Sequence, residues 1–426
     1  MADPKIVGPD IVFSTCGLST FQADFAGLLT AAEVKELRWL VSRSGGQFEP
    51  AGSTGPVLSL ELPPAPQGYS WRLKVVSAVK QLEAELLLTV IGMTTEPYVQ
   101  LTAPIAESDI AEVTLPKSKA VRYMAPTSAE GGVFEVGRRT HYKRTKPATD
   151  NIGLKSAEPG QGPRFDGRAL APRSDIGHWA MILQASTVAE GGQSFVAANT
   201  YDNARMTFGL LQFTPHVPNA QLVLLLRTWL AREDADLYFP MLKLQEVGGK
   251  RLIHDRAGKL LEDEHSNEAL QRVLNPDLSR IDGAEKQVLA SLIYLARTDA
   301  RTCLDQVKLG VSNFKGYLHG LKGLGIDGRP DYVCALVCDI RNQGRSGPMT
   351  VSQCLRLDQA GKAEHDKVYR ALLSIKGRLD DKEKVYEFAS RVRHVDAAIQ
   401  DMRASGELGK LKYDEATGGF VPIEIK

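Results

Sequence analysis

Hydrophobic positions along the chain follow two periods, and each period predicts a different kind of structure. Residues 57–62 alternate between apolar and polar side chains, and residues 71–75 repeat the alternation. Such alternation is typical of a strand with one buried face. The apolar run at residues 82–91 fits a helix or a strand, but its β-branched end favours a strand. Residues 1–136 are therefore predicted to form a β-rich accessory or targeting domain.

Helical spacing dominates from residue 174 onwards. Apolar side chains recur there at intervals of three and four residues, which indicates amphipathic or buried helices. The predicted helices cover residues 175–190, 284–298, 332–342, 364–375 and 383–402. Ser174 is the predicted N-cap of the first helix, and Gly248-Gly249 is the predicted turn of a hairpin over residues 244–254. The predicted fold class is α+β, with a mainly α domain over residues 174–426.

A basic segment rich in proline and glycine, residues 137–173, lies between the two predicted domains. Its basic residues are Arg138, Arg139, His141, Lys143, Arg144 and Lys146. We interpret the segment as a solvated linker, because charged stretches interrupted by proline and glycine do not favour a packed core. The alternative is a local electrostatic contact with an anionic wall polymer or a membrane surface.

The composition is that of an ordinary globular protein. The 426 residues suit two or three domains. Hydrophobic residues make up 43% and charged residues 24% of the chain, and the net charge is only +1. A balance this close to zero gives no global attraction to nucleic acid, so nucleic acid is not among the predicted partners.

Cysteine usage predicts free thiols rather than disulfides or a metal site. The five cysteines are Cys16, Cys303, Cys334, Cys338 and Cys354. An odd and sparse set does not form a disulfide framework and fits synthesis in a reducing compartment. Cys334 and Cys338 share one face of a predicted helix, but no second pair stands at ligand spacing, so no metal and no cofactor are predicted.

The N-terminal residues lack the basic and apolar regions of a signal peptide, and no run of about 18 apolar residues predicts a transmembrane segment. We therefore expect synthesis in the cytoplasm without a signal peptide.

The stretch over residues 189–216 carries the candidate chemistry. Glu190 stands at the predicted end of a helix, and Gly191-Gly192 follows it. A polar turn over residues 201–203 then precedes a Thr-Phe-Gly-Leu-Leu-Gln run over residues 207–212. A glutamic acid in a partly apolar cleft can stay protonated near neutral pH, which suits it to general acid catalysis.

This stretch resembles the lysozyme-like superfamily. The pattern Glu190-Gly-Gly, followed by Thr207-Phe208-Gly209-Leu210-Leu211-Gln212, is similar to the Glu and Gly-Leu-Met-Gln pairing of lytic transglycosylases and goose-type lysozymes. Phage-type lysozymes and chitosanases carry a helix-terminal Glu followed by an Asp-bearing β-hairpin. The resemblance is sharp over roughly thirty residues and diffuse over residues 165–405. It implies a lysozyme-like fold with a small β-hairpin at the cleft.

The resemblance also implies roles for individual residues. Glu190 would be the general acid, Asp202 would activate water or stabilise charge, and Thr207 would lie beside the catalytic water. The implied substrate-binding residues are Tyr201, Asn203, Gly209, Gln212, Asn342 and Gln343. Each has a structural alternative: Asp202 suits a turn, Thr207 suits a strand, and residues 339–344 suit a helix C-cap.

The function implied is cleavage of β-1,4 glycosidic bonds in peptidoglycan, by hydrolysis or by lytic transglycosylation. Two alternatives remain open: a chitosanase-like hydrolase, and a non-catalytic wall-binding component of a phage or secretion apparatus. The implied partner is peptidoglycan or a related amino-sugar polymer. An inhibitor or immunity protein is a second partner expected for an enzyme of this kind. Action at the cell wall or periplasm would follow phage lysis or specialised export.

Overall fold

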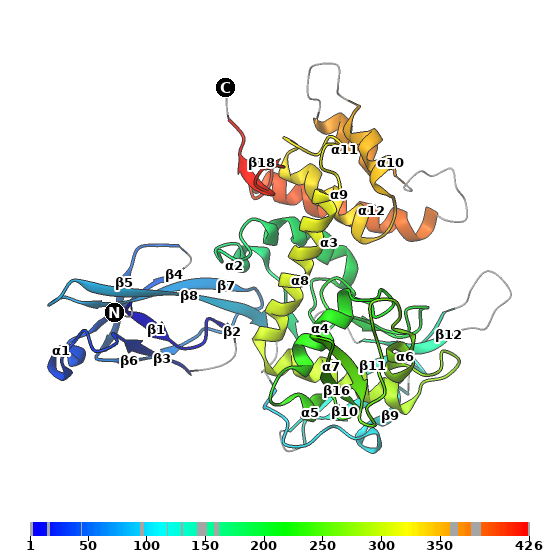
Figure 1. Cartoon of the computed structure of the whole chain (residues 1–426), viewed down its shortest axis with the longest axis horizontal. Coiled ribbons are helices and arrows are strands. Elements are labelled where there is room, and N and C mark those ends of the chain that lie inside the picture. Colours follow the sequence, from blue (N-terminus) through cyan, green and yellow to red (C-terminus); the bar gives the residue numbers. More distant parts are fainter. Residues whose placement is uncertain are drawn as a thin grey trace. The chain divides into compact units, whose positions relative to one another are not determined.

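The computed structural model of the chain (Figure 1) belongs to the α+β class, as predicted. Strands dominate residues 5–155, and mostly helices with small hairpins follow. The structure describes residues 3–14, 18–43, 45–93, 98–116, 118–128, 131–142, 151–156, 162–357, 365–375 and 385–424.

Contacts within the chain divide it into two compact units, and neither unit is continuous in sequence. Unit 1 comprises Met1–Phe165 and Ser194–Gln306, and unit 2 comprises Asp166–Gln193 and Val307–Lys426. The division therefore passes through the stretch that carries the candidate chemistry, just after Glu190. The domain boundaries expected from the sequence stay a prediction.

The N-terminal part of unit 1 contains two sheets. The first pairs β1 (Lys5–Val7), β3 (Leu18–Asp24) and β6 (Val57–Glu61). The second runs in the order β13 (Pro163–Arg164), β8 (Leu82–Met93), β7 (Tyr69–Ser77), β4 (Arg38–Arg43) and β5 (Glu49–Thr54), with β2 (Ile11–Phe13) parallel to β8. The short helix α1 (Ala31–Lys35) precedes β4. The two strands expected from alternation are thus confirmed as β6 and β7, and the strand favoured by the β-branched end of residues 82–91 is confirmed as β8.

Alternation produces the core of this part because every second side chain of a strand points to the same face. Trp39 on β4, Leu73 on β7 and Leu88 on β8 are all buried and belong to one hydrophobic cluster. Phe21 on β3 and Leu58 on β6 join the same cluster. Figure 1 shows β7 and β8 running side by side as a long hairpin, in agreement with their antiparallel register.

A third sheet of unit 1 ends in the stretch of interest. Its order is β15 (Thr207–Phe208), β14 (Ala198–Asn199), β12 (Asn151–Lys155), β11 (Val133–Tyr142), β10 (Val121–Pro126) and β9 (Ala111–Thr114). The short 3-10 helix η1 (Glu107–Asp109) precedes β9. Arg138, Arg139 and His141 of the basic segment lie in β11, whereas residues 143–150 and 157–161 lie outside the described part of the chain.

Helices and one hairpin complete unit 1. The helices are α4 (Gln221–Leu230), α5 (Ala235–Tyr238), α6 (Glu268–Leu274), α7 (Gly283–Thr298) and the start of α8 (Ala300–His319). The helix expected over residues 284–298 is confirmed as α7. The expected hairpin is confirmed as β16 (Leu242–Val247) and β17 (Lys250–Asp255), with Gly248 and Gly249 at positive φ in its turn.

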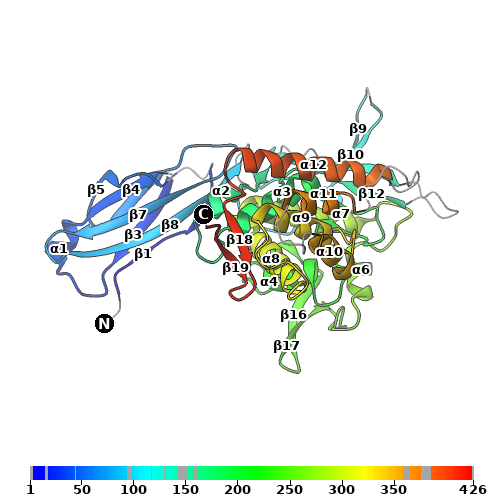
Figure 2. The same ribbon diagram turned by 90° about the horizontal axis from the view of Figure 1, so that it is seen from above.

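Unit 2 is mainly helical. It contains α2 (Gly167–Leu170), α3 (Trp179–Gly191), the rest of α8, α9 (Asp331–Asn342), α10 (Pro348–Leu355), α11 (His365–Leu373), α12 (Val385–Ala404) and the hairpin β18 (Leu411–Asp414) and β19 (Gly419–Pro422). Both α3 and α12 pack against α9, and Figure 2 shows α12 lying over them. The helix expected over residues 332–342 is confirmed as α9, and the described parts of those expected over residues 364–375 and 383–402 are confirmed as α11 and α12, whereas residues 364, 383 and 384 lie outside the described part of the chain.

The start of α3 corrects one expectation. Ser174 is not its N-cap; the helix begins at Trp179, and His178 occupies the cap position. Gly177 has a φ of 59°, a left-handed conformation that interrupts any helix running from residue 175. The expected end is confirmed, because Gly192 closes α3 with a φ of 60°.

Cysteines 334 and 338 are buried free thiols on α9, as expected from their spacing. Cys16 lies outside the described residues. Across the described ranges, no helix is both long and apolar enough to cross a membrane.

Candidate functional site

Glu190 lies in the last turn of α3, with its side chain turned into unit 2. Only 10% of the side chain is exposed. Arg391 on α12 contacts one carboxylate oxygen, with Nη1 3.0 Å from Oε2. The other oxygen accepts hydrogen bonds from Gln343 Nε2 and, at 3.3 Å, from Asn342 Nδ2. The structure therefore brings together three of the residues singled out in the sequence, although they are about 150 positions apart.

A second carboxylate stands behind the first. Asp339 on α9 is fully buried and accepts one hydrogen bond from Arg391 and one from Arg345. Arg345 follows Gly344, which takes a left-handed φ of 60° just beyond α9. We call this set the Glu190 cluster, and it comprises Glu190, Asp339, Asn342, Gln343, Arg345 and Arg391.

Burial dominates the protonation of Glu190. Removal from water raises the pKa of Glu190 to about 7, and the nearby negative charge of Asp339 acts in the same direction. The charge and hydrogen bond of Arg391 and the hydrogen bond of Gln343 oppose the rise without cancelling it. A pKa in this range allows Glu190 to hold a proton near neutral pH, which is the state that a general acid needs.

The arginines of the cluster have more donors than the cluster uses. Nε of Arg391 and both Nε and Nη1 of Arg345 are buried and have no hydrogen-bond partner among the described residues. Two arginines face two carboxylates, so the cluster is neutral when Glu190 is ionised and carries one net positive charge when Glu190 is protonated. The protonated state therefore leaves positive charge without a counterion.

Thr207 and Gln212 lie together in unit 1, at the β14–β15 hairpin. Gln212 Oε1 accepts from Thr207 Oγ1 at 2.9 Å and from Asn199 Nδ2 at 3.2 Å. Gln212 Nε2 donates to the carbonyls of Ala197 and Gly209. A glutamine amide offers two donors and two acceptor positions, so all four are used within the hairpin. Gln212 therefore stabilises the turn through these hydrogen bonds.

The backbone conformation and the close packing at position 209 both require a glycine. Its φ is 81°, and a Cβ atom at this position would lie 2.1 Å from Oε1 of Gln306. Gln306 accepts from the Leu210 amide and donates to the carbonyl of Phe195. The space beside Gly209 is thus taken by a buried side chain that ties α8 to the turn. Its predicted contact with substrate stays a prediction.

The polar turn over residues 201–203 also lies in unit 1. Asp202 Oδ1 accepts from the Ala204 amide at 3.0 Å, which is the hydrogen bond of an Asx turn. Burial raises the pKa of Asp202, while the Ala204 hydrogen bond and the charge of His216 lower it by less. Tyr201 stacks on Tyr142 with ring centroids 5.9 Å apart, and Asn203 is exposed.

Glu285 is another buried carboxyl group, and the sequence had not suggested it. It accepts from the amides of Leu154 and Asp282 and from the Thr200 hydroxyl. Burial raises the pKa of Glu285 to about 7, although these hydrogen bonds act against the rise. The available signal was the Asp282-x-x-Glu285 pattern, which forms a capping box at the start of α7.

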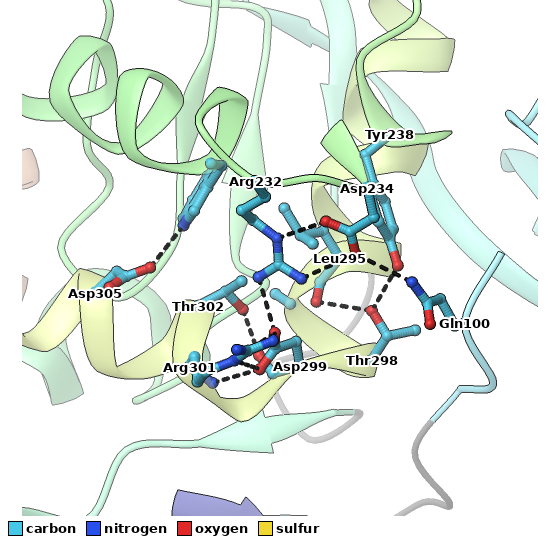
Figure 3. A network of polar contacts seen from close by, with 12 residues as sticks. Gln100, Arg232, Asp234, Tyr238, Leu295, Thr298, Asp299, Arg301, Thr302 and Asp305 are labelled. Atoms are coloured by element: carbon cyan, nitrogen blue, oxygen red, sulfur yellow. Dashed lines mark hydrogen bonds and ion pairs between the residues drawn. The ribbon is translucent and has the colours of Figure 1, made fainter. Parts of the chain in front are cut away.

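Unit 1 also holds a polar pocket of about 520 Å³. Figure 3 shows Arg232 between Asp234 and Asp299, with contacts of 2.8 Å to each. Arg301 pairs with Asp299 at 2.6 Å, and Gln100 donates to Asp234 at 3.2 Å. We call these five residues the Arg232 network. Its ion pairs join the turn after α4 to the junction of α7 and α8, so we interpret the network as structural.

Arg391 is the functional candidate that sequence reasoning missed. It stands four residues before Val395 and eight before Ile399, both fully buried on the inner face of α12. An arginine at an apolar position of an amphipathic helix must find a buried partner, because an unpaired buried charge is very unfavourable. That position was the signal, but it does not reveal which carboxylate is the partner.

Comparisons with known proteins assign no function to the chain, so the functional argument rests on its own residues. No family model, curated protein or solved structure matches the chain. Glu190, Asn342 and Gln343 belong to unit 2, whereas Tyr201, Asp202, Asn203, Thr207, Gly209 and Gln212 belong to unit 1. Among the described residues, no group of three or more His, Cys, Asp or Glu side chains is placed to hold a metal ion.

Proposed function

We propose that the protein cleaves β-1,4 glycosidic bonds in peptidoglycan, with Glu190 as the general acid. The observation that carries the proposal is the placement of Glu190: it lies at a helix end, nine-tenths buried among Arg391, Asn342 and Gln343, and burial raises its pKa to about 7. The sequence pattern around it, which resembles that of the lysozyme-like superfamily, supplies the reaction class.

In the proposed reaction, Glu190 gives its proton to the leaving glycosidic oxygen as the bond from that oxygen to the anomeric carbon breaks. The carboxylate left behind is stabilised by Gln343 and Asn342, whose amide groups already donate to one of its oxygens. The anomeric carbon is then attacked by water, or by a hydroxyl of the same sugar in a transglycosylase. The roles that the resemblance implies for Asp202 and Thr207 stay predictions, because both residues belong to unit 1 and Glu190 belongs to unit 2.

A specific observation favours a second candidate, a wall-binding component without catalysis. Both oxygens of Glu190 are engaged by neighbouring side chains, and a buried ion pair with satisfied oxygens is also how proteins fix helices in place. Under this alternative, Glu190 would bind α3 to α9 and α12 and would never transfer a proton.

The test is the substitution Glu190→Gln, which keeps the size of the side chain and removes the proton. Purified peptidoglycan sacculi are incubated with each variant, and soluble products are identified by mass spectrometry. We expect the wild-type chain to release muropeptides and the rate to fall about 100-fold or more in Glu190→Gln, the scale of a lost general acid. Reducing ends would indicate hydrolysis, and anhydro sugars would indicate transglycosylation.

Glu246→Gln is the matched control, because Glu246 is exposed on the hairpin strand β16. It should cleave at the wild-type rate. If the wild-type chain binds sacculi and releases no product, the non-catalytic alternative replaces the proposal. If chitosan is cleaved and peptidoglycan is not, the polymer assigned here is wrong.

A further inference from the structure

The Glu190 cluster has an imbalance that appears only when Glu190 is protonated. In the ionised state, Arg391 is shared between Glu190 and Asp339, and Arg345 contacts Asp339 alone. Protonation removes one of the two negative charges but neither of the positive ones. Buried charge without a counterion is costly, so this state favours the entry of an anion.

The spare hydrogen-bonding capacity of the cluster lies on the same side chains. Nε of Arg391 and both Nε and Nη1 of Arg345 lack a partner among the described residues. Protonated Glu190 also has fewer lone pairs to offer to Arg391, Gln343 and Asn342 than the carboxylate has. A planar carboxylate matches the paired N–H donors of a guanidinium better than a neutral hydroxyl does.

We propose that Arg391 binds a carboxylate of the substrate, and that this contact replaces its ion pair with Glu190. The proposal rests on the function proposed above, because it assigns the polymer that supplies the anion. Peptidoglycan carries carboxylates on the lactyl group of its muramic acid and on its stem peptides. Chitosan is cationic and chitin is uncharged, so neither offers this contact.

The binding of an anion at Arg391 and the protonation of Glu190 are thermodynamically linked, so each favours the other. An anion that binds better when Glu190 is protonated must favour that protonation by the same factor. The charged groups that act on Glu190 are Arg391 from α12 and Asp339 from α9, and Arg345 stands behind Asp339. Occupation of Arg391 by the substrate therefore leaves Glu190 holding the proton that cleavage requires.

The experiment measures the binding of small wall fragments to the full chain by NMR titration between about pH 6 and about pH 9. N-acetylmuramic acid carries the lactyl carboxylate, N-acetylglucosamine lacks it, and a free stem peptide carries carboxylates without the sugar. We expect the dissociation constant of N-acetylmuramic acid to rise about tenfold for each pH unit above about 8, where one proton is taken up per anion bound. N-acetylglucosamine should show no such dependence.

The stem peptide identifies the source of the carboxylate. Stronger and pH-dependent binding of the peptide would assign the contact to the peptide instead of the lactyl group, and would still support a substrate carboxylate at Arg391. Equal, pH-independent binding of all three probes would overturn the proposal.

Matched variants locate the site. Arg391→Gln should remove the pH dependence, while Arg393→Gln, an exposed arginine on the same helix, should keep it. Arg391→Lys retains the charge and serves where Arg391→Gln does not fold; it should keep a weakened pH dependence. If the pH dependence is unchanged in Arg391→Gln, or absent in wild type, the proposal is wrong.

The failure of this proposal can be distinguished from the failure of the proposed function. Release of muropeptides by the wild-type chain, without pH-dependent binding of the acidic probes, would retain the function and reject the role of Arg391. Binding that depends on pH and on Arg391, without any release of muropeptides, would retain the anion contact and reject the glycosidase.

Discussion

The Glu190 cluster of unit 2 and the Arg232 network of unit 1 both combine arginines, carboxylates and side-chain amides. Even so, the pKa of Glu190 is raised in the first, and the pKa values of Asp299 and Asp234 are lowered in the second. Burial raises the pKa of Glu190 to about 7 despite its contact with Arg391. Burial also acts to raise the pKa of Asp299, but hydrogen bonds from Arg301 and Arg232 outweigh it and the pKa lies below its usual value. Arg232 likewise lowers the pKa of Asp234.

The difference lies in the charge of the side-chain donors: Glu190 receives two hydrogen bonds from the neutral amides of Asn342 and Gln343, whereas the side-chain donors to Asp299 are guanidinium groups. Asp299 is contacted by two guanidinium groups and by the Arg301 amide. Glu190 shares one guanidinium with a second carboxylate, whose charge also disfavours ionisation. A carboxylate paired with two guanidinium groups favours the ionised form, whereas a deeply buried carboxylate that shares its guanidinium with a second carboxylate favours the protonated form.

The largest expected effect concerns Arg345, whose side chain is fully buried against Asp339. Arg345→Met should lower the free energy of unfolding by about 3–5 kcal/mol, because it leaves a buried carboxylate under-paired. Urea unfolding measures the change. Arg393→Met on the exposed face of α12 should cost less than about 0.5 kcal/mol. A loss of similar size in both variants would contradict the special position of the Glu190 cluster.

A smaller effect concerns the pH dependence of stability. The pKa of Glu190 is raised from 4.5 to about 7, so the folded chain binds more protons than the unfolded chain between these values. Stability from this group is fully present below about pH 4.5 and is lost as pH rises through about 7, on the order of 1–3 kcal/mol. Glu285 contributes with the same sign.

Thermal unfolding across this pH range in wild type, Glu190→Gln and Glu285→Gln measures the two contributions. Each substitution should flatten part of the loss, because an amide does not ionise. An unchanged slope in Glu190→Gln would show that Glu190 is ionised across the range, as a plain ion pair with Arg391 would be.

The smallest expected effect concerns Asp299 in the Arg232 network. Asp299→Asn should cost about 1–2 kcal/mol in urea unfolding at neutral pH, because the charge-assisted bonds weaken while Arg232 keeps Asp234. The sign with pH is opposite to that of Glu190: a depressed pKa adds stability that is present above about 3.8 and lost as pH falls. A difference between wild type and Asp299→Asn that grows toward low pH would contradict this pairing.

Local pattern was enough to predict much of the secondary structure. The alternation in β6 and β7, the β-branched end of β8, the Gly248-Gly249 turn, and the spans of α7, α9, α11 and α12 all follow from neighbouring residues. The prediction of Ser174 as an N-cap was wrong. Serine is a common N-cap, but Gly177 takes a left-handed conformation that a helix cannot continue through. The end predicted at Glu190 lies one residue from the observed end of α3 at Gly191, because Gly191-Gly192 is a strong stop signal.

The sequence by itself predicted the fold class, the spans of several strands and helices, and Glu190 as a candidate, because capping, turn chemistry and hydrophobic period act over a few residues. Only the tertiary structure decided which groups surround that carboxyl. Arg391 is 201 positions from Glu190 and meets it only because α3 and α12 both pack on α9. Burial and charge depend on distances in space, so the protonation of Glu190 is a property of the packed helices and not of any short run of residues.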